Sequence, residues 1–76
     1  MKEWQGISEF VAVAELGSFS KAAKVLGISV AQVSRTVLQL EQRLNCKLVL
    51  RTTRQVRLTE QGTLYYQQCR ALVNGL

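Results

Sequence analysis

A group of polar and basic side chains in the middle of the chain has the types and spacing that suit reading DNA. Placed on a helix, they fall within one arc of roughly 100°; they are Gln32, Arg35, Thr36, Gln39 and Arg43. Glutamine and arginine carry the paired groups that recognise adenine and guanine edges in the major groove. The arc has no acidic residue, because Glu41 points back toward the predicted core. The pattern favours a helix that reads base edges; an ordinary solvated polar face is the alternative.

A second basic group follows at residues 51–55. Two short β-prone runs, 47–50 and 56–58, flank it, which predicts that it forms the tip of a β-hairpin. The tip has no glycine, so we expect a loose loop of about four or five residues rather than a tight turn. Its side chains suit contacts with phosphates or a minor groove; those expected to contact DNA are Arg51, Thr53 and Arg54. A merely solvated tip is the alternative.

Positive charge is concentrated in the same part of the chain. The net charge of +5 divides into −2 for residues 1–17, +7 for residues 18–58 and zero for residues 59–76. The central block holds eight Lys or Arg residues against Glu41 alone. A basic block between acidic or neutral ends is expected of a protein that presents one face to a polyanion.

The titratable side chains exclude most catalytic and metal chemistry. The chain has no histidine and no aspartate, so it cannot build a Ser-His-Asp triad or a histidine-based metal site. Cys46 and Cys69 lie 23 positions apart, which matches no zinc spacing. Two cysteines without a secretory signal predict free thiols rather than a disulfide. We therefore expect no enzymatic activity, no cofactor and no metal.

Length and hydropathy predict one small domain. Its 76 residues can bury a single modest core, and 47% apolar with 20% charged residues is an ordinary globular composition. The longest apolar run, residues 10–14, is far shorter than the about 20 residues of a membrane span. The first residues lack the apolar core of a signal peptide. We expect a cytoplasmic protein with no membrane partner.

Helix signals place the reading arc on the third of four predicted helices. The first is expected over about residues 3–16 and the second over about 18–26, each followed by a glycine. Ser29, with Gln32 three positions on, has the form of a capping box and should start a third helix at about 30–44. A short helix, a glycine turn and a longer helix form a helix-turn-helix. The core-facing residues of the third helix are expected to be Val33, Val37, Leu40 and Leu44.

Residues 59–76 are predicted to form a fourth helix that begins at the capping residue Thr59. An apolar stripe runs along it; its members are Leu64, Tyr65, Cys69, Leu72, Val73 and Leu76. A chain of this size has one modest core, so we expect part of the stripe to remain exposed and to form a dimer interface with a second copy. Complete packing of the stripe against the first helix is the alternative.

The pattern as a whole resembles the N-terminal DNA-binding domain of LysR-type transcriptional regulators. The resemblance covers essentially the whole chain without gaps. It rests on the run 10–23 and on later residues at the family's intervals; these are Leu26, Ser29, Val33, Ser34, Arg35, Leu40, Glu41, Leu44, Leu48, Arg51, Thr52, Arg54, Val56, Leu58, Thr59 and Gly62.

The resemblance implies a mainly α fold: a three-helix winged helix-turn-helix with a two-stranded wing and a C-terminal linker helix that pairs with its twin. Residues 1–58 would form the DNA-binding domain and residues 59–76 the linker. By position, the implied DNA contacts are Ser29, Val30, Ala31, Gln32, Ser34, Arg35 and Thr36, with Arg51 and Arg54 in the wing.

The recognition segment also departs from the family pattern. Members often have glutamine and then proline or serine where this chain has Val30 and Ala31, and a small apolar residue in place of Gln32. Base reading should therefore shift toward Gln32, or toward contacts between the two apolar residues and thymine methyl groups.

We therefore expect a bacterial transcriptional regulator fragment that binds double-stranded DNA sequence-specifically as a homodimer. The helix at about 30–44 would enter the major groove. A small-molecule effector would bind only in a longer C-terminal domain beyond this chain. The main alternative is a winged-helix interaction module that dimerises through residues 60–76 without reading DNA. RNA binding is less favoured, because the major groove of A-form RNA is closed to side chains.

Overall fold

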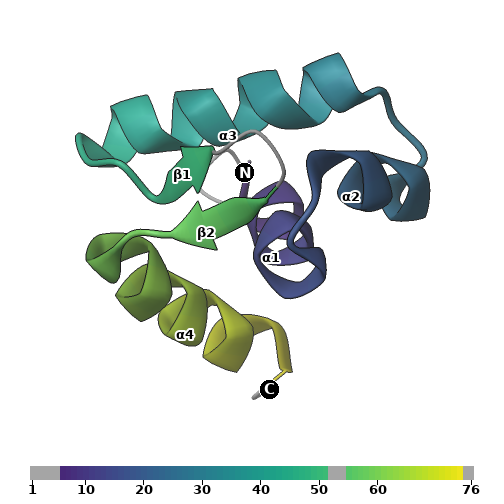
Figure 1. The fold of residues 1–76 in the computed structure, drawn as a ribbon. Coiled ribbons are helices and arrows are strands. Elements are labelled where there is room, and N and C mark those ends of the chain that lie inside the picture. The colour runs from purple at the N-terminus through teal and green to yellow at the C-terminus, as the bar shows by residue number, and fades with distance from the viewer. Residues whose placement is uncertain (1–5, 52–54, 75–76) are drawn as a thin grey trace.

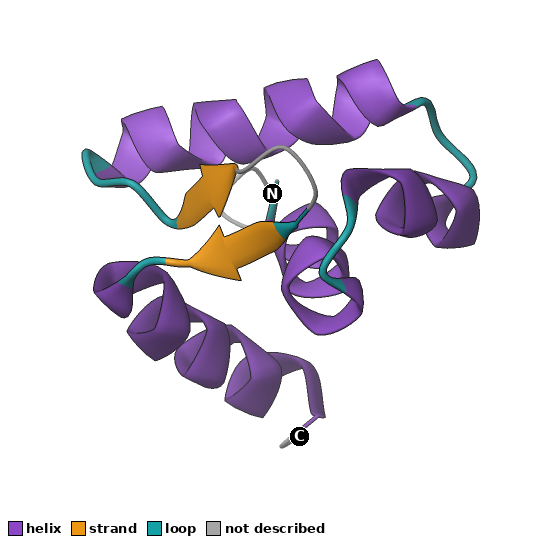
Figure 2. Cartoon of the chain, in the orientation of Figure 1, coloured by secondary structure: helices purple, strands orange, loops and turns teal. Residues whose placement is uncertain are grey.

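The computed structural model describes residues 6–51 and 55–74, with side chains as far as residue 71. Within these residues the chain forms four helices and one antiparallel two-stranded sheet (Figures 1 and 2). In chain order the elements are α1 (Ile7–Leu16), α2 (Phe19–Leu26), α3 (Val30–Leu44), β1 (Val49–Arg51), β2 (Val56–Leu58) and α4 (Glu60–Asn74). This confirms the predicted mainly α, winged helix-turn-helix architecture.

The helix α1 occupies the middle of the molecule. It packs against α2, α3 and α4, and strand β2 contacts both α1 and α4. As a result α3 and α4 lie on opposite sides of the fold, with α1 and the hairpin between them (Figure 1). One long side of α3 is left facing away from the rest of the chain (Figure 2).

Local capping groups set the ends of α2 and α3 where the sequence predicts them. The hydroxyls of Ser18 and Ser29 each accept a hydrogen bond from the backbone N–H three residues on, at 3.1 and 3.0 Å. Gly27 has φ 73° and so makes the sharp turn between the two helices without a Cβ clash. Asn45 ends α3 at φ 58°, which is the left-handed conformation that asparagine tolerates.

The start of α1 differs from the prediction. The helix begins at Ile7, because Gly6 has φ 92° and cannot be part of it. Gly6 is buried against α3, where an added Cβ would lie 3.2 Å from the Cβ of Leu40. The earlier part of the predicted 3–16 helix lies outside the described residues.

A single core joins α1, α2, α3 and the start of β1. Its buried members are Phe10, Val13, Ala22, Ala23, Val33, Val37, Leu40, Leu48 and Val49. The prediction that Leu44 also faces this core is wrong, since 37% of its surface is exposed. The position that turns inward instead is Glu41, because the end of α3 meets the backbone of β1 rather than another apolar helix face.

The predicted apolar stripe of α4 is divided between core and surface. Tyr65 is half-buried with its ring centroid 5.7 Å from that of Phe10, whereas Leu64 is 59% exposed. Cys69 is only 1% exposed, so its prediction as part of an exposed dimer stripe is wrong: this side of α4 faces α1. Burial raises the pKa of the Tyr65 phenol and of the Cys69 thiol. At the surface, the Tyr66 hydroxyl donates a hydrogen bond to a Glu15 carboxylate oxygen at 2.9 Å, which also links α4 to α1.

Both cysteines are free thiols, as the sequence predicts. In the described part of the chain no helix is long and apolar enough to cross a membrane. Over the same residues no three Cys or Glu side chains gather in a group that could hold a metal ion.

Thr59 and Gly62 join the hairpin to α4. The Thr59 hydroxyl donates to the Lys47 carbonyl at 2.6 Å and accepts from the Gly62 N–H at 2.9 Å, while the Thr59 N–H donates to the Leu48 carbonyl at 3.0 Å. Gly62 is buried directly over Leu48, and an added Cβ would overlap the Leu48 carbonyl oxygen. The Leu-Thr-x-x-Gly motif therefore holds the start of α4 against Leu48, the residue that precedes β1.

Candidate nucleic-acid interface

The outward side of α3 carries most of the side chains that the sequence predicts for DNA contact. Six of the predicted contact residues on or next to this helix are exposed, and so is the neighbouring Arg43; the six are Ser29, Val30, Ala31, Gln32, Arg35 and Gln39. Ser34 and Thr36 are only half-buried at the two edges of this face. The buried side of the same helix is formed by Val33, Val37, Leu40 and Glu41. One helix thus separates an apolar inner side from a basic and amide-bearing outer side.

Two of the predicted contact residues have hydroxyls that are engaged by the backbone of α3 itself. The Ser29 oxygen accepts from the Gln32 N–H, and the Thr36 hydroxyl donates to the Gln32 carbonyl at 2.8 Å. The Thr36 methyl group also lies next to Gly6 at the start of α1. Ser29 is therefore a capping residue, and Thr36 sits at the edge of the outer face beside another helix.

Sequence reasoning overlooked two exposed residues on the same side of α3. Gln42 lies seven positions after Arg35, two helical turns on, and Leu38 lies three positions after it. Leu38 is 46% exposed. At about 100° per residue Gln42 lies about 20° from Arg35, just outside the predicted arc of roughly 100°.

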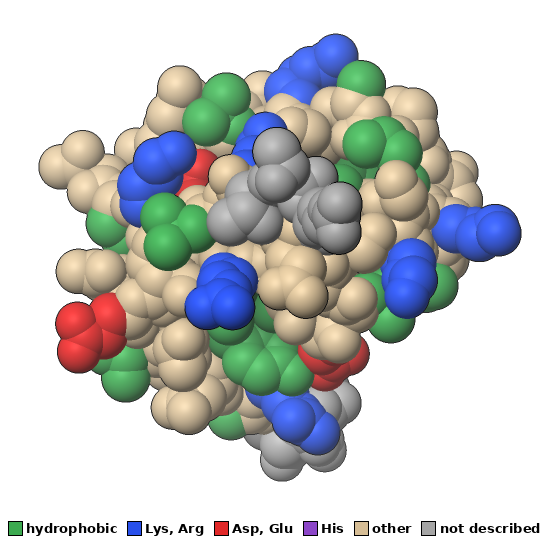
Figure 3. All heavy atoms as spheres, in the orientation of Figure 1, with side chains coloured by type: hydrophobic (Ala, Val, Ile, Leu, Met, Phe, Trp, Pro, Cys, Tyr) green, Lys and Arg blue, Asp and Glu red, His purple; other side chains and the backbone are tan. Residues whose placement is uncertain are grey.

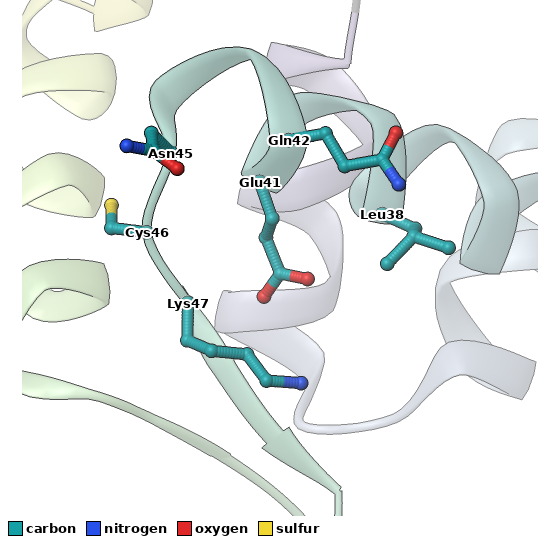
Figure 4. A pocket seen from close by; sticks show the side chains of 6 residues that line it. All are labelled: Leu38, Glu41, Gln42, Asn45, Cys46 and Lys47. Atoms are coloured by element: carbon teal, nitrogen blue, oxygen red, sulfur yellow. The ribbon is translucent and has the colours of Figure 1, made fainter.

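Beyond Leu38 and Gln42, the end of α3 borders a shallow depression of about 320 Å³. Its lining also includes Glu41, Asn45, Cys46 and Lys47 (Figure 4). In this view Glu41 reaches from α3 toward the segment that leads into β1.

Glu41 attaches the start of the hairpin to α3. Its Oε2 accepts hydrogen bonds from the backbone N–H groups of Leu48 and Val49, at 2.8 and 3.0 Å. Only 6% of its surface is exposed, so these bonds are made away from water. A buried carboxylate with two donors holds the first residues of β1 at a fixed place along α3. Together with the burial of Leu48 and Val49 in the core, this side chain fixes the hairpin relative to α3.

The base of the wing is described, whereas its tip is not. In the hairpin Val49 pairs with Leu58 and Arg51 with Val56, which leaves positions 52–55 for the predicted loose connection. The predicted contacts Thr53 and Arg54 lie outside the described residues. Arg51 is exposed, and its guanidinium carbon lies 4.6 Å from the centre of the Phe19 ring, at the first residue of α2.

Cations dominate the surface around α2, α3 and the hairpin. Those described and exposed here are Lys21, Lys24, Arg35, Arg43, Lys47, Arg51 and Arg57. Two acids that could offset them are engaged elsewhere, since Glu41 binds the backbone of β1 and Glu15 accepts from Tyr66. The face drawn in Figure 3 shows more Lys and Arg side chains than acidic ones. Such a surface attracts a polyanion.

Comparison with known proteins decides the family. The family model for bacterial regulatory helix-turn-helix proteins of the lysR family matches residues 4–63. The chain belongs to the lysR family. Among its relatives is the HTH-type transcriptional activator AaeR of Escherichia coli K12, 45% identical over 74 residues. That match covers 97% of this chain but 24% of AaeR, so the chain spans about a quarter of the length of this relative.

Solved structures of lysR-family DNA-binding domains have the same fold. The structure of the BenM DNA-binding domain with benA site 1 DNA superposes with a TM-score of 0.88 at 37% identity, over 92% of this chain and 79% of that one. The complex of the CbnR DNA-binding domain with DNA gives 0.86 at 32% identity, over 90% of this chain and 78% of that one. In both cases the solved chain is bound to DNA.

Proposed function

We propose that this chain is the double-stranded DNA-binding domain of a bacterial transcriptional regulator and that it reads sequence through the outer face of α3. The observation that carries the proposal is the division of that helix, with Arg and Gln side chains exposed and its one acid, Glu41, buried against β1. A helix whose outer face bears no carboxylate can lie in a major groove without repelling phosphates. The lysR-family domains solved with DNA support the same assignment.

The roles of individual residues follow from their exposure. Gln32, Arg35 and Gln39 are exposed and carry groups that pair with base edges or phosphates. Val30 is 45% exposed at the first position of α3, and with Ala31 it offers an apolar surface to thymine methyl groups. The wing, based at Arg51, would contact the backbone or a minor groove.

The chain corresponds to one quarter of the length of AaeR. We propose that residues 1–58 form the DNA-binding domain, that residues 59–76 form a linker helix, and that a small-molecule effector acts on the remainder of a longer regulator. Such a regulator would work in the bacterial cytoplasm, where its DNA is. A non-enzymatic role fits the transcriptional regulators to which the chain is similar.

Replacing Arg35 with alanine is expected to weaken specific binding by about 1–3 kcal/mol, or about 5- to 150-fold in Kd. The duplex for this measurement comes from selection of random sequences on the chain, and fluorescence anisotropy gives Kd. Arg70→Ala is the matched control, because it removes the same charge from an exposed position on α4, on the opposite side of the fold (Figure 1). Its Kd should stay close to that of the unchanged protein.

Salt dependence separates this proposal from an interaction module that does not bind DNA. If about six phosphates are contacted, log affinity should fall against log salt concentration with a slope near −5. Absence of binding, or an Arg35 variant no weaker than the Arg70 control, would overturn the assignment of α3 as the reading helix.

We also propose that the protein forms a homodimer through the exposed side of α4. Leu64, at 59% exposure, borders a groove of about 260 Å³ whose lining includes Leu44, Leu48 and Tyr65. An apolar groove beside an exposed leucine suits a second copy of the same helix. Of the other predicted dimer residues, Leu72 and Val73 belong to α4 but their side chains are not described, and Leu76 lies outside the described residues.

Leu64→Glu is expected to shift the protein toward monomers, because it places a charge on each side of the proposed contact. Sedimentation velocity measures the shift, and circular dichroism at low temperature should show an unchanged helical content, since Leu64 lies outside the core. Gln67→Glu adds the same charge at another exposed position of α4 and serves as control. Equal dissociation in both variants, or in neither, would rule out Leu64 as part of the interface.

A further inference from the structure

The contact between Arg51 and Phe19 joins two parts of the molecule that are distant in sequence. Arg51 is the last residue of β1 and pairs with Val56, so it is the last described position before the wing connection. Phe19 is the first residue of α2, directly after the capping residue Ser18. The guanidinium carbon lies 4.6 Å from the ring centre, within the range of a cation–π interaction.

The two partners differ in how firmly they are held. Phe19 is half-buried and packs against the hydrophobic core, whereas Arg51 is exposed. The ring is therefore a fixed platform on which a long and otherwise mobile side chain rests. An exposed cation–π contact contributes little to global folding, but it restricts the positions of the arginine. The main effect of the contact is to fix the position of the positive charge of Arg51.

The contact leaves Arg51 able to bind an anion. A ring face uses none of the five N–H donors of a guanidinium, so all remain available to phosphate oxygens. The Arg51 guanidinium also lies near the N-terminal end of α2. That end of the helix dipole carries partial positive charge and repels a cation unless an anion lies between them. A negative group bound between them would be attracted both by the Arg51 guanidinium and by the N-terminal end of α2.

We propose that Phe19 is a positioning residue for DNA binding, which holds the Arg51 guanidinium in place for a phosphate of the DNA backbone. This inference rests on the proposed function. It differs from a direct contact, since Phe19 acts through Arg51 and lowers the loss of side-chain freedom on binding. The hydrogen bonds of Glu41 hold the backbone at the start of β1, and the Phe19 ring holds the Arg51 side chain at the end of that strand.

A double-mutant cycle tests the inference. The variants are Phe19→Leu, Phe19→Tyr, Arg51→Ala and the double variant of Phe19→Leu with Arg51→Ala. The probe is a mixed-sequence duplex of about 30 base pairs, because phosphate contacts do not depend on sequence. Kd is measured over a series of salt concentrations, and thermal melting of each variant is recorded beside it.

Phe19→Leu should weaken binding about two- to fivefold, because the Arg51 side chain, no longer held by the ring, must then be ordered when it binds a phosphate. Phe19→Tyr should keep the affinity, because the ring remains. In the Arg51→Ala background the leucine change should have no further effect on Kd, and Arg51→Ala should reduce the salt slope by about 0.9.

Two results would overturn the inference while leaving DNA binding intact. One is an equal effect of Phe19→Leu with and without Arg51, which would mean that Phe19 acts only through packing. The other is an equal loss of affinity in the leucine and tyrosine variants. Failure of the unchanged protein to bind the duplex at all would instead reject the proposed function.

Discussion

Gly62→Ala is expected to destabilise the fold by about 3 kcal/mol, the upper part of the usual range for overpacking. An added Cβ would overlap the carbonyl oxygen of Leu48, which is backbone and cannot move aside as a flexible side chain would. Alanine favours a helix by about 1 kcal/mol over glycine, and this gain is smaller than the expected steric cost. For a domain of this size the melting temperature should fall by about 15 °C. Thermal unfolding followed by circular dichroism measures it.

Gln61→Ala is the matched control for this prediction. Gln61 is exposed and precedes Gly62 on α4, so the substitution changes helix propensity without entering the contact with Leu48. The control should melt close to the unchanged protein. A Gly62→Ala variant at least as stable as the control would show that the start of α4 does not lie against Leu48 as described.

Glu41→Ala is expected to cost about 2–6 kcal/mol of folding free energy, since an unsatisfied buried donor costs about 1–3 kcal/mol and two are created. The donors are the backbone N–H groups of Leu48 and Val49, which now share one carboxylate oxygen. Chemical denaturation with urea gives the free energy of unfolding. Because β1 would lose its attachment to α3, hydrogen exchange of these two amides should also accelerate.

Two variants bracket the role of Glu41. Glu41→Gln keeps an acceptor oxygen of similar reach and should lose less stability than the alanine variant. Gln42→Ala changes the exposed neighbouring residue and should leave stability nearly unchanged. If Glu41→Ala and Gln42→Ala unfold at the same urea concentration, the two hydrogen bonds contribute nothing to the fold.

Several elements follow from short-range chemistry that a sequence displays directly. A serine hydroxyl caps the N–H three residues on, and an asparagine ends a helix in the left-handed conformation, whatever surrounds them. The bounds of α2 and α3, with Ser18, Ser29 and Asn45 at their ends, were therefore predictable. The outer face of α3 followed from the 100° repeat in the same way, because a helix of known phase has a known outside.

Interactions between elements distant in the chain were not predictable in this way. Helical periodicity assigns a side chain to a face but does not say which backbone that face meets, so Glu41 was placed at the core boundary without its partners Leu48 and Val49. The same reason applies to Cys69. Its place in the apolar stripe of α4 was predictable, but its burial depends on the packing of α4 against α1. Leu44 was misplaced for a related reason, since its phase on α3 is that of the core but it is the last residue of the helix, where 37% of its surface is exposed.

By itself the sequence determined the helices, their caps, the basic centre of the chain and the side of α3 that carries Gln32 and Arg35, because each depends on residues within a few positions of one another. Only the tertiary structure decided that Phe19 meets Arg51, that Gly62 passes Leu48 and that part of the α4 stripe is core. Those contacts depend on how helices cross and where a strand is attached, and these geometries arise from packing the whole chain at once.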